Sequence, residues 1–175
     1  MGGVYSPPML IILRLIHVLS GAFWIGAALF NVIFLVPTIR ALGPTAGPVM
    51  QHLVQVKKMP IWLLGAGVLT FLSGLSLYWR ASGGFSNGWM QSGPGMTFGL
   101  GAVFALLAIL VGMLFTTPAA KRAGEIAASL GSQPPTPEKA AELKAAQKRI
   151  GITSALATLF VFFATCAMAV ARYIP

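Results

Sequence analysis

Four long apolar stretches constrain the fold of this chain more than any other feature of its sequence. They cover residues about 9–36, 60–79, 96–118 and 150–172, and charged side chains are almost absent from their interiors. A helix needs roughly 20 apolar residues to cross about 30 Å of hydrocarbon at about 1.5 Å per residue. The sequence therefore predicts an all-α integral membrane protein, in which residues 1–175 form a single antiparallel bundle of four transmembrane helices.

The few charged residues, 9% of the chain, are unevenly distributed between the predicted loops. Loop 38–59 carries three Lys or Arg residues and loop 119–149 carries six, whereas the opposite side has only Arg14, Arg80 and Arg172. Because basic loops stay in the cytoplasm, we expect a multi-pass protein of a bacterial-type inner or cell membrane with both termini extracytoplasmic. The charges lie at helix ends and in loops, so we expect the lipid bilayer as a partner and no nucleic acid. Other membrane subunits are expected as partners because catalytic groups are absent and several helices carry stripes of small residues.

Prolines and glycines predict where the first helix ends. Pro37 and the Gly-Pro pairs at 43–44 and 47–48 interrupt the chain directly after the first apolar stretch. Such residues end helices and form turns, so residues 38–59 are expected to be a cytoplasmic loop.

The loop at 119–149 is of a different kind. Residues 119–130 are good helix formers that extend the third helix, and residues 131–137 are rich in helix breakers. Thr136 can then act as an N-cap, with Pro137 at the first helical position. The sequence thus predicts a short cytoplasmic helical hairpin that leads into the fourth span.

Small and weakly polar residues recur at helical spacing in the three later spans. Such stripes let helix backbones approach closely within a membrane, and they predict bundle packing without any cofactor. They comprise Gly67, Thr70, Gly74 and Tyr78 in the second span, Thr97, Gly101, Ala105, Ala108, Gly112 and Thr116 in the third, and Ser154, Thr158, Thr165 and Ala169 in the fourth.

The first span carries its unusual residues on one face. Steps of three and four residues place on that face Arg14, His17, Gly21, Trp24, Ala28 and Asn31. This face is expected to meet the bundle or a partner rather than lipid. An ionisable residue within a span marks a functional site by default.

His17 has three interpretations from the sequence, one of which is ligation of copper or another metal. Its imidazole can donate a hydrogen bond to the backbone of a neighbouring helix, while Arg14 extends to the outer surface. Alternatively, His17 is the axial ligand of haem b or a related tetrapyrrole. Gly21 would then leave a hollow for the flat macrocycle, with Trp24 as its wall.

A second axial ligand would have to come from the outer half of the bundle. Met96 and Met168 are the candidates there, since His52 lies towards the opposite end of the first helix and is expected near lipid headgroups. Arg14 would be placed to bind a haem propionate. A copper-handling alternative rests on Cys166 and Met168, which are soft ligands for Cu(I).

The pattern His17-x6-Trp24-x-Gly26, together with basic cytoplasmic loops, resembles small four-helix membrane proteins related to the copper-resistance D family. It resembles more distantly the membrane protoporphyrinogen oxidase family. The resemblance implies that His17 is associated with haem b or a metal. The oxidase family also uses a basic residue in a later span, and this chain has no Lys or Arg inside its second, third or fourth span away from the ends.

Catalytic side chains are missing from the predicted spans. All three acidic residues lie between 119 and 149, and the sequence offers no Ser-His-Asp set, carboxylate pair or phosphate-binding loop. We therefore expect no catalytic residues. The main alternative to a tetrapyrrole-binding redox or pigment protein is a non-catalytic accessory subunit of a larger bioenergetic membrane complex.

Overall fold

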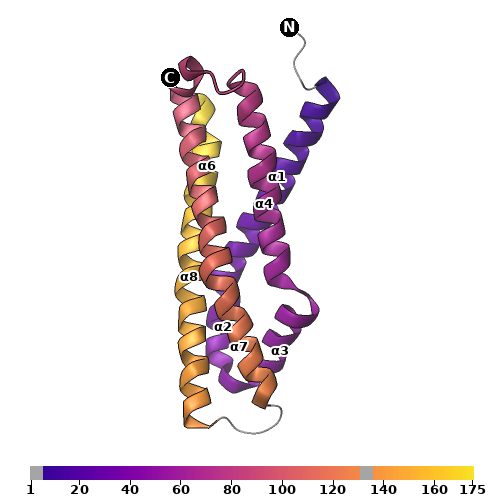
Figure 1. The fold of residues 1–175 in the computed structure, drawn as a ribbon, viewed down its shortest axis with the longest axis vertical. Helices are drawn as coiled ribbons and strands as arrows, with labels where there is room; N and C mark the ends of the chain where they lie inside the picture. Colours follow the sequence, from indigo (N-terminus) through magenta and orange to yellow (C-terminus); the bar gives the residue numbers. More distant parts are fainter. Residues whose placement is uncertain (1–5, 131–135) are drawn as a thin grey trace.

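The computed structural model describes residues 6–130 and 136–175, and within these residues it contains helices and turns but no strand (Figure 1). Four helical segments are long and apolar enough to cross a membrane: Pro7–Leu42, Met59–Ala81, Gly93–Leu130 and Pro137–Tyr173. The prediction of an all-helical chain with four such helices is confirmed.

The first segment continues past the proline that was expected to end it. It consists of α1 (Pro7–Phe30), a π-helical turn, η1 (Asn31–Leu35), and α2 (Val36–Leu42). In η1 the N–H of Val36 bonds to the carbonyl of Asn31, five residues back. This wider turn accommodates the ring of Pro37, which collides with a carbonyl four residues back in a regular α-helix. The predicted end at Pro37 is therefore wrong.

The third segment also contains a π-helical turn shortly before a proline. It comprises α6 (Gly93–Val111), the π-helical turn η4 (Gly112–Thr116) and α7 (Thr117–Leu130). The N–H of Thr117, the residue before Pro118, bonds to the carbonyl of Gly112. The predicted extension of the third helix to residue 130 is confirmed.

The remaining elements are also helical. The segment 38–59, which was expected to be a loop, is largely helical instead. Its first residues are the end of α2, and three short elements follow: η2 (Gly43–Ala46), α3 (Gly47–Gln51) and η3 (His52–Val56). Gly43, with φ of 58°, makes the break after α2. The later elements are α4 (Met59–Ala81), α5 (Asn87–Met90), α8 (Pro137–Val170) and η5 (Ala171–Tyr173).

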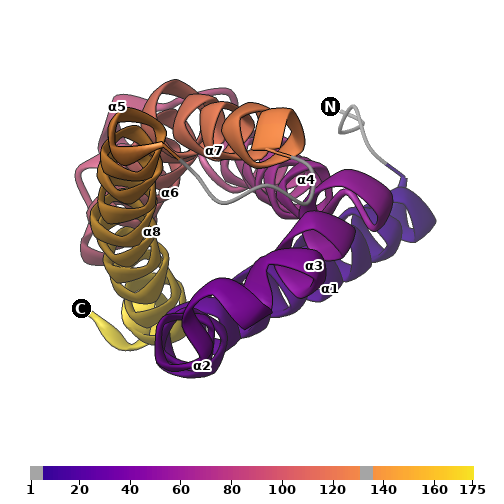
Figure 2. The same ribbon diagram turned by 90° about the horizontal axis from the view of Figure 1, so that it is seen from below.

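The long helices associate as two pairs, α1 with α4 and α6 with α8 (Figures 1 and 2). The Tyr78 hydroxyl of α4 donates to the carbonyl of Gly95 in α6, at 3.1 Å. The Thr158 hydroxyl of α8 donates to the carbonyl of Ala28 in α1, at 3.4 Å. The two pairs share one core, formed by Trp24, Ala66, Ala105, Ala108, Ile109, Val161 and Ala164.

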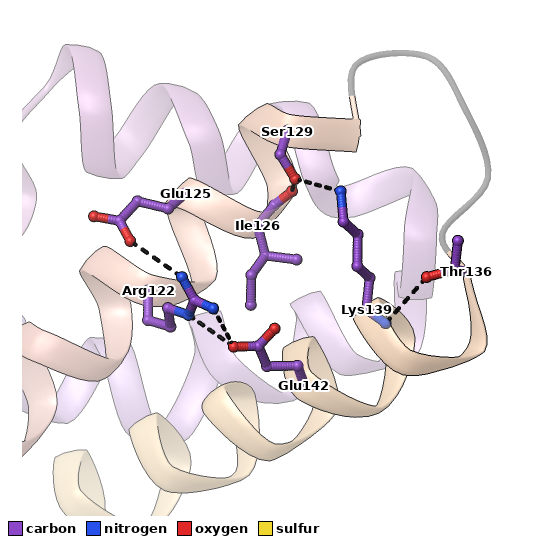
Figure 3. A network of polar contacts seen from close by, with 7 residues as sticks. All are labelled: Arg122, Glu125, Ile126, Ser129, Thr136, Lys139 and Glu142. Carbon is purple, nitrogen blue, oxygen red and sulfur yellow. Dashed lines mark hydrogen bonds and ion pairs between the residues drawn. The ribbon is translucent and has the colours of Figure 1, made fainter.

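The helical hairpin forms as predicted between α7 and the start of α8 (Figure 3). The Thr136 side chain caps α8 by accepting the N–H of Lys139 at 3.4 Å, which confirms its role as N-cap. Across the hairpin, Nε of Arg122 donates to Oε1 of Glu142 at 2.8 Å. Ile126, only 4% exposed, packs in the hairpin.

The small-residue stripe of the fourth helix is partly displaced from its predicted face. Ser154 and Thr158 are buried as expected, but Thr165 and Ala169 are exposed. The C-terminal half of α8 buries Val161, Ala164 and Ala167 instead. Small residues occur on several sides of this helix, so their spacing alone selected the wrong face for its second half.

Candidate functional site

The face of α1 predicted from its spacing contacts α4 in a regular register. Each step of three or four residues along α1 is matched by an equal step in the opposite direction along α4. Within each contact, one helix supplies a glycine and the other a larger side chain, an arrangement that brings helix backbones close together. The three contacts join His17 with Gly74, Gly21 with Thr70, and Trp24 with Gly67.

The His17 imidazole is oriented by the backbone of α4. Its Nδ1 lies 2.8 Å from the carbonyl oxygen of Thr70. A carbonyl oxygen only accepts, so Nδ1 carries the proton and donates it. The Ser73 hydroxyl lies 3.5 Å from the same nitrogen and donates to the Leu69 carbonyl at 2.6 Å. In the neutral imidazole, the free lone pair is therefore on Nε2.

Gly74 allows this close approach of the imidazole. A Cβ atom at this position would lie 2.7 Å from Cε1 and 3.0 Å from Nδ1 of His17, but 3.7 Å from Nε2. The Nε2 atom accepts no hydrogen bond from the described residues, and it is not enclosed by them. The ring therefore lies against α4 through Nδ1 and Cε1, and Nε2 is not fully buried.

Gly21 and Trp24 take part in helix pairing. The hollow expected beside Gly21 receives Thr70, whose Cγ2 would lie 3.4 Å from a Cβ atom there. The Thr70 hydroxyl also donates to the Ser20 hydroxyl at 2.8 Å. Trp24, 9% exposed, lies so close to Gly67 that a Cβ atom there would be 2.9 Å from its ring. A macrocycle bound to Nε2 would thus lie away from this interface.

Within the described residues, no hydrogen bond joins the His17 side chain to the other predicted site residues. Arg14 is exposed on α1, and no described carboxylate pairs with it. Met96 of α6 is 60% exposed, and Met168 of α8 contacts α6 through its Cε atom. Cys166 is exposed, and the described residues contain no group of three His, Cys, Asp or Glu side chains suited to a metal.

The hydroxyl groups that surround His17 were not predicted as site residues. Ser20, Thr70 and Ser73 link α1 to α4 or orient the imidazole. Thr70 and Ser73 lie three residues apart, so the spacing placed them on one helical face. Sequence alone did not show that this face meets His17.

No family model, curated protein or solved structure matches the chain. The function is therefore inferred from the residues around His17. The chemistry available there is that of an imidazole whose Nδ1 is held by the Thr70 carbonyl and whose Nε2 has no hydrogen-bond partner among the described residues.

Proposed function

We propose that this chain is an integral membrane protein that binds a tetrapyrrole, haem b or a related pigment, through Nε2 of His17. The observation that carries the proposal is the hydrogen bond from Nδ1 to the Thr70 carbonyl, which fixes the tautomer and the ring. Histidines that bind metals almost always donate their other N–H in this way. An Nε2 atom left without a partner in hydrocarbon costs free energy, and a metal ligand bond removes that cost.

Each nearby residue has a distinct part in this proposal. His17 binds the metal, and Thr70 and Ser73 hold the imidazole in place. Arg14, one helical turn from His17, neutralises a propionate through its guanidinium group. Met96 and Met168 stay predictions for the second ligand position. The bound haem would supply one-electron redox chemistry, and a pigment would supply light absorption.

The visible spectrum of the purified full-length chain tests this function. We expect a Soret band in the wild type, its loss in His17→Ala, and its recovery when imidazole is added to His17→Gly. His52→Ala is the matched control, since His52 is exposed at the other end of the helices, and it should keep the band. A folded wild type without a Soret band, or a full band in His17→Ala, would reject the proposal.

A second candidate, a non-catalytic accessory subunit, is favoured by the exposure of the first segment. In the most apolar 18-residue stretch of this segment only 6% of the residues are buried, compared with 28% in the corresponding stretches of the third and fourth segments. Helices of another subunit can cover such a surface. Stoichiometric co-purification from native membranes without a Soret band would support this candidate. Copper analysis of the same preparation tests the copper-handling alternative.

The proposal includes an antiparallel arrangement across an inner or cell membrane with both termini extracytoplasmic. It is supported by the nine basic residues of the segments 38–59 and 119–149. In a Cys166→Ser background, Ser6→Cys should react with an impermeant thiol reagent in intact cells. Ala128→Cys should react only after permeabilisation. The reverse pattern would overturn this topology.

A further inference from the structure

A groove of about 560 Å³ runs along the outside of the α1–α4 pair. The groove is open along its length, so an occupant would remain partly exposed to the surroundings of the helices. The lining is apolar except for one serine, and its large side chains come from both helices: Leu19 and Phe23 of α1, and Ile61, Trp62 and Leu69 of α4. Ile61 and Trp62 are 66% and 67% exposed, so the groove opens to the surroundings of the helices at this end.

Two lysines lie where the groove reaches the start of α4. The carbonyl of Lys58 accepts the N–H groups of Ile61 at 2.9 Å and Trp62 at 3.2 Å. Lys57 precedes it, and the N–H of Lys57 bonds to the carbonyl of His52 at 2.9 Å. Both lysines are exposed, and the ion pairs of the described residues all lie in the α7–α8 hairpin. Their charge therefore has no carboxylate to compensate it.

We propose that the groove and these two lysines form a site for one anionic phospholipid. An acyl chain lies in the groove against Phe23 and Leu69, and the phosphate contacts Lys57 and Lys58. A phospholipid joins an anionic group directly to hydrocarbon, which matches the lysines that immediately precede Ile61. The exposed Trp62 ring lies at the junction, as aromatic residues do at headgroup level. Neither His17 nor its hydrogen-bond partner Thr70 lines the groove, so the proposed lipid site does not depend on tetrapyrrole binding.

Headgroup selectivity is the first test. The purified full-length chain is equilibrated with an anionic and a zwitterionic phospholipid of identical acyl chains, and native mass spectrometry counts the retained lipids. Each lysine near a phosphate should contribute about fivefold, so Lys57→Gln/Lys58→Gln should lower the anionic preference by about 25-fold. Lys144→Gln/Lys148→Gln removes the same charge from exposed positions of α8 and should retain the preference. Equal loss in both double variants, or no preference in the wild type, would overturn the proposal.

Filling the groove is the second test. No atom lies within 4 Å of a Cβ position at Gly65, so Gly65→Leu adds bulk to the groove without a clash. Gly112→Leu is the control, because its Cβ position is equally free and it lies in the third segment. Brominated acyl chains should quench Trp62, measured as the difference from Trp62→Phe, and Gly65→Leu alone should reduce this quenching. If Gly65→Leu instead changes the oligomeric mass and leaves lipid retention intact, a second copy occupies the groove and the lipid site is rejected.

Discussion

Gly74→Ala should uncouple His17 from α4 without removing any side chain that bonds to the imidazole. The added methyl group would lie 2.7 Å from Cε1 and 3.0 Å from Nδ1 of His17. The ring is held by the 2.8 Å bond to the Thr70 carbonyl, so it cannot move away and keep that bond. The substitution therefore has one of two costs. Either the new methyl group overlaps the imidazole, or the imidazole moves and loses its hydrogen bond to the Thr70 carbonyl.

The size of the effect follows from these two costs. Extra methyl groups in a packed interface cost about 1–3 kcal/mol. An interhelical hydrogen bond in a membrane protein contributes about 0.6 kcal/mol on average and up to about 1.7. Gly65→Ala is the matched control, because its methyl group meets no atom within 4 Å. Both variants gain the same helix propensity, about 1 kcal/mol, so it cancels in their comparison. The imidazole adopts whichever alternative costs less, so Gly74→Ala should be about 1–2 kcal/mol less stable than Gly65→Ala.

Unfolding of the full-length protein in mixed micelles, followed by circular dichroism during a denaturing-detergent titration, measures this difference. A double-mutant cycle adds a second criterion. His17→Ala should cost less in the Gly74→Ala background than in the wild type, because it removes the overlapping ring. Equal unfolding free energies for Gly74→Ala and Gly65→Ala, together with additive effects of His17→Ala, would refute the proposed packing of the imidazole.

Three further predictions concern the basic end of the molecule. Gly43→Ala should destabilise the chain by about 1–3 kcal/mol because φ is 58° and ψ is −134° there, whereas Gly47→Ala, in α3, should not, as thermal unfolding would show. Thr136→Ala should cost about 1 kcal/mol through loss of the α8 cap, measurable as faster hydrogen exchange in the first turn. Arg122 and Glu142 are 56% and 45% exposed, so their coupling in a double-mutant cycle should be below about 1 kcal/mol and should fall with added salt.

The sequence was informative where one physical rule dominated. Length and hydropathy identified all four apolar helices, and the spacing of His17 and Trp24 identified the face of α1 that meets α4. Thr136 was recognised as a cap because threonine before proline at a helix start has few other local roles. These features depend on periodicity and local chemistry, and both can be read from a single chain.

The predictions that were wrong concern features that depend on tertiary contacts. Pro37 was expected to end a helix, but the widened turn at Asn31–Leu35 accommodates the proline within a continuous segment. Thr70 occupies the space beside Gly21 that sequence reasoning had left open for a macrocycle. Neither outcome was accessible before the partner of each residue was known. Spacing shows which residues share a face, but not what lies against that face.

The pairing of α1 with α4, and of α6 with α8, has a consequence for biosynthesis. The acceptor for the His17 imidazole lies 53 positions downstream, and every residue that contacts α1 from α4 precedes residue 82. A chain emerges from the ribosome N-terminus first, and its units fold in that order. The first pair can therefore close, with His17 already oriented, before α6 and α8 have been synthesised. The second pair then assembles on a preformed surface, so the order of assembly follows the order of translation.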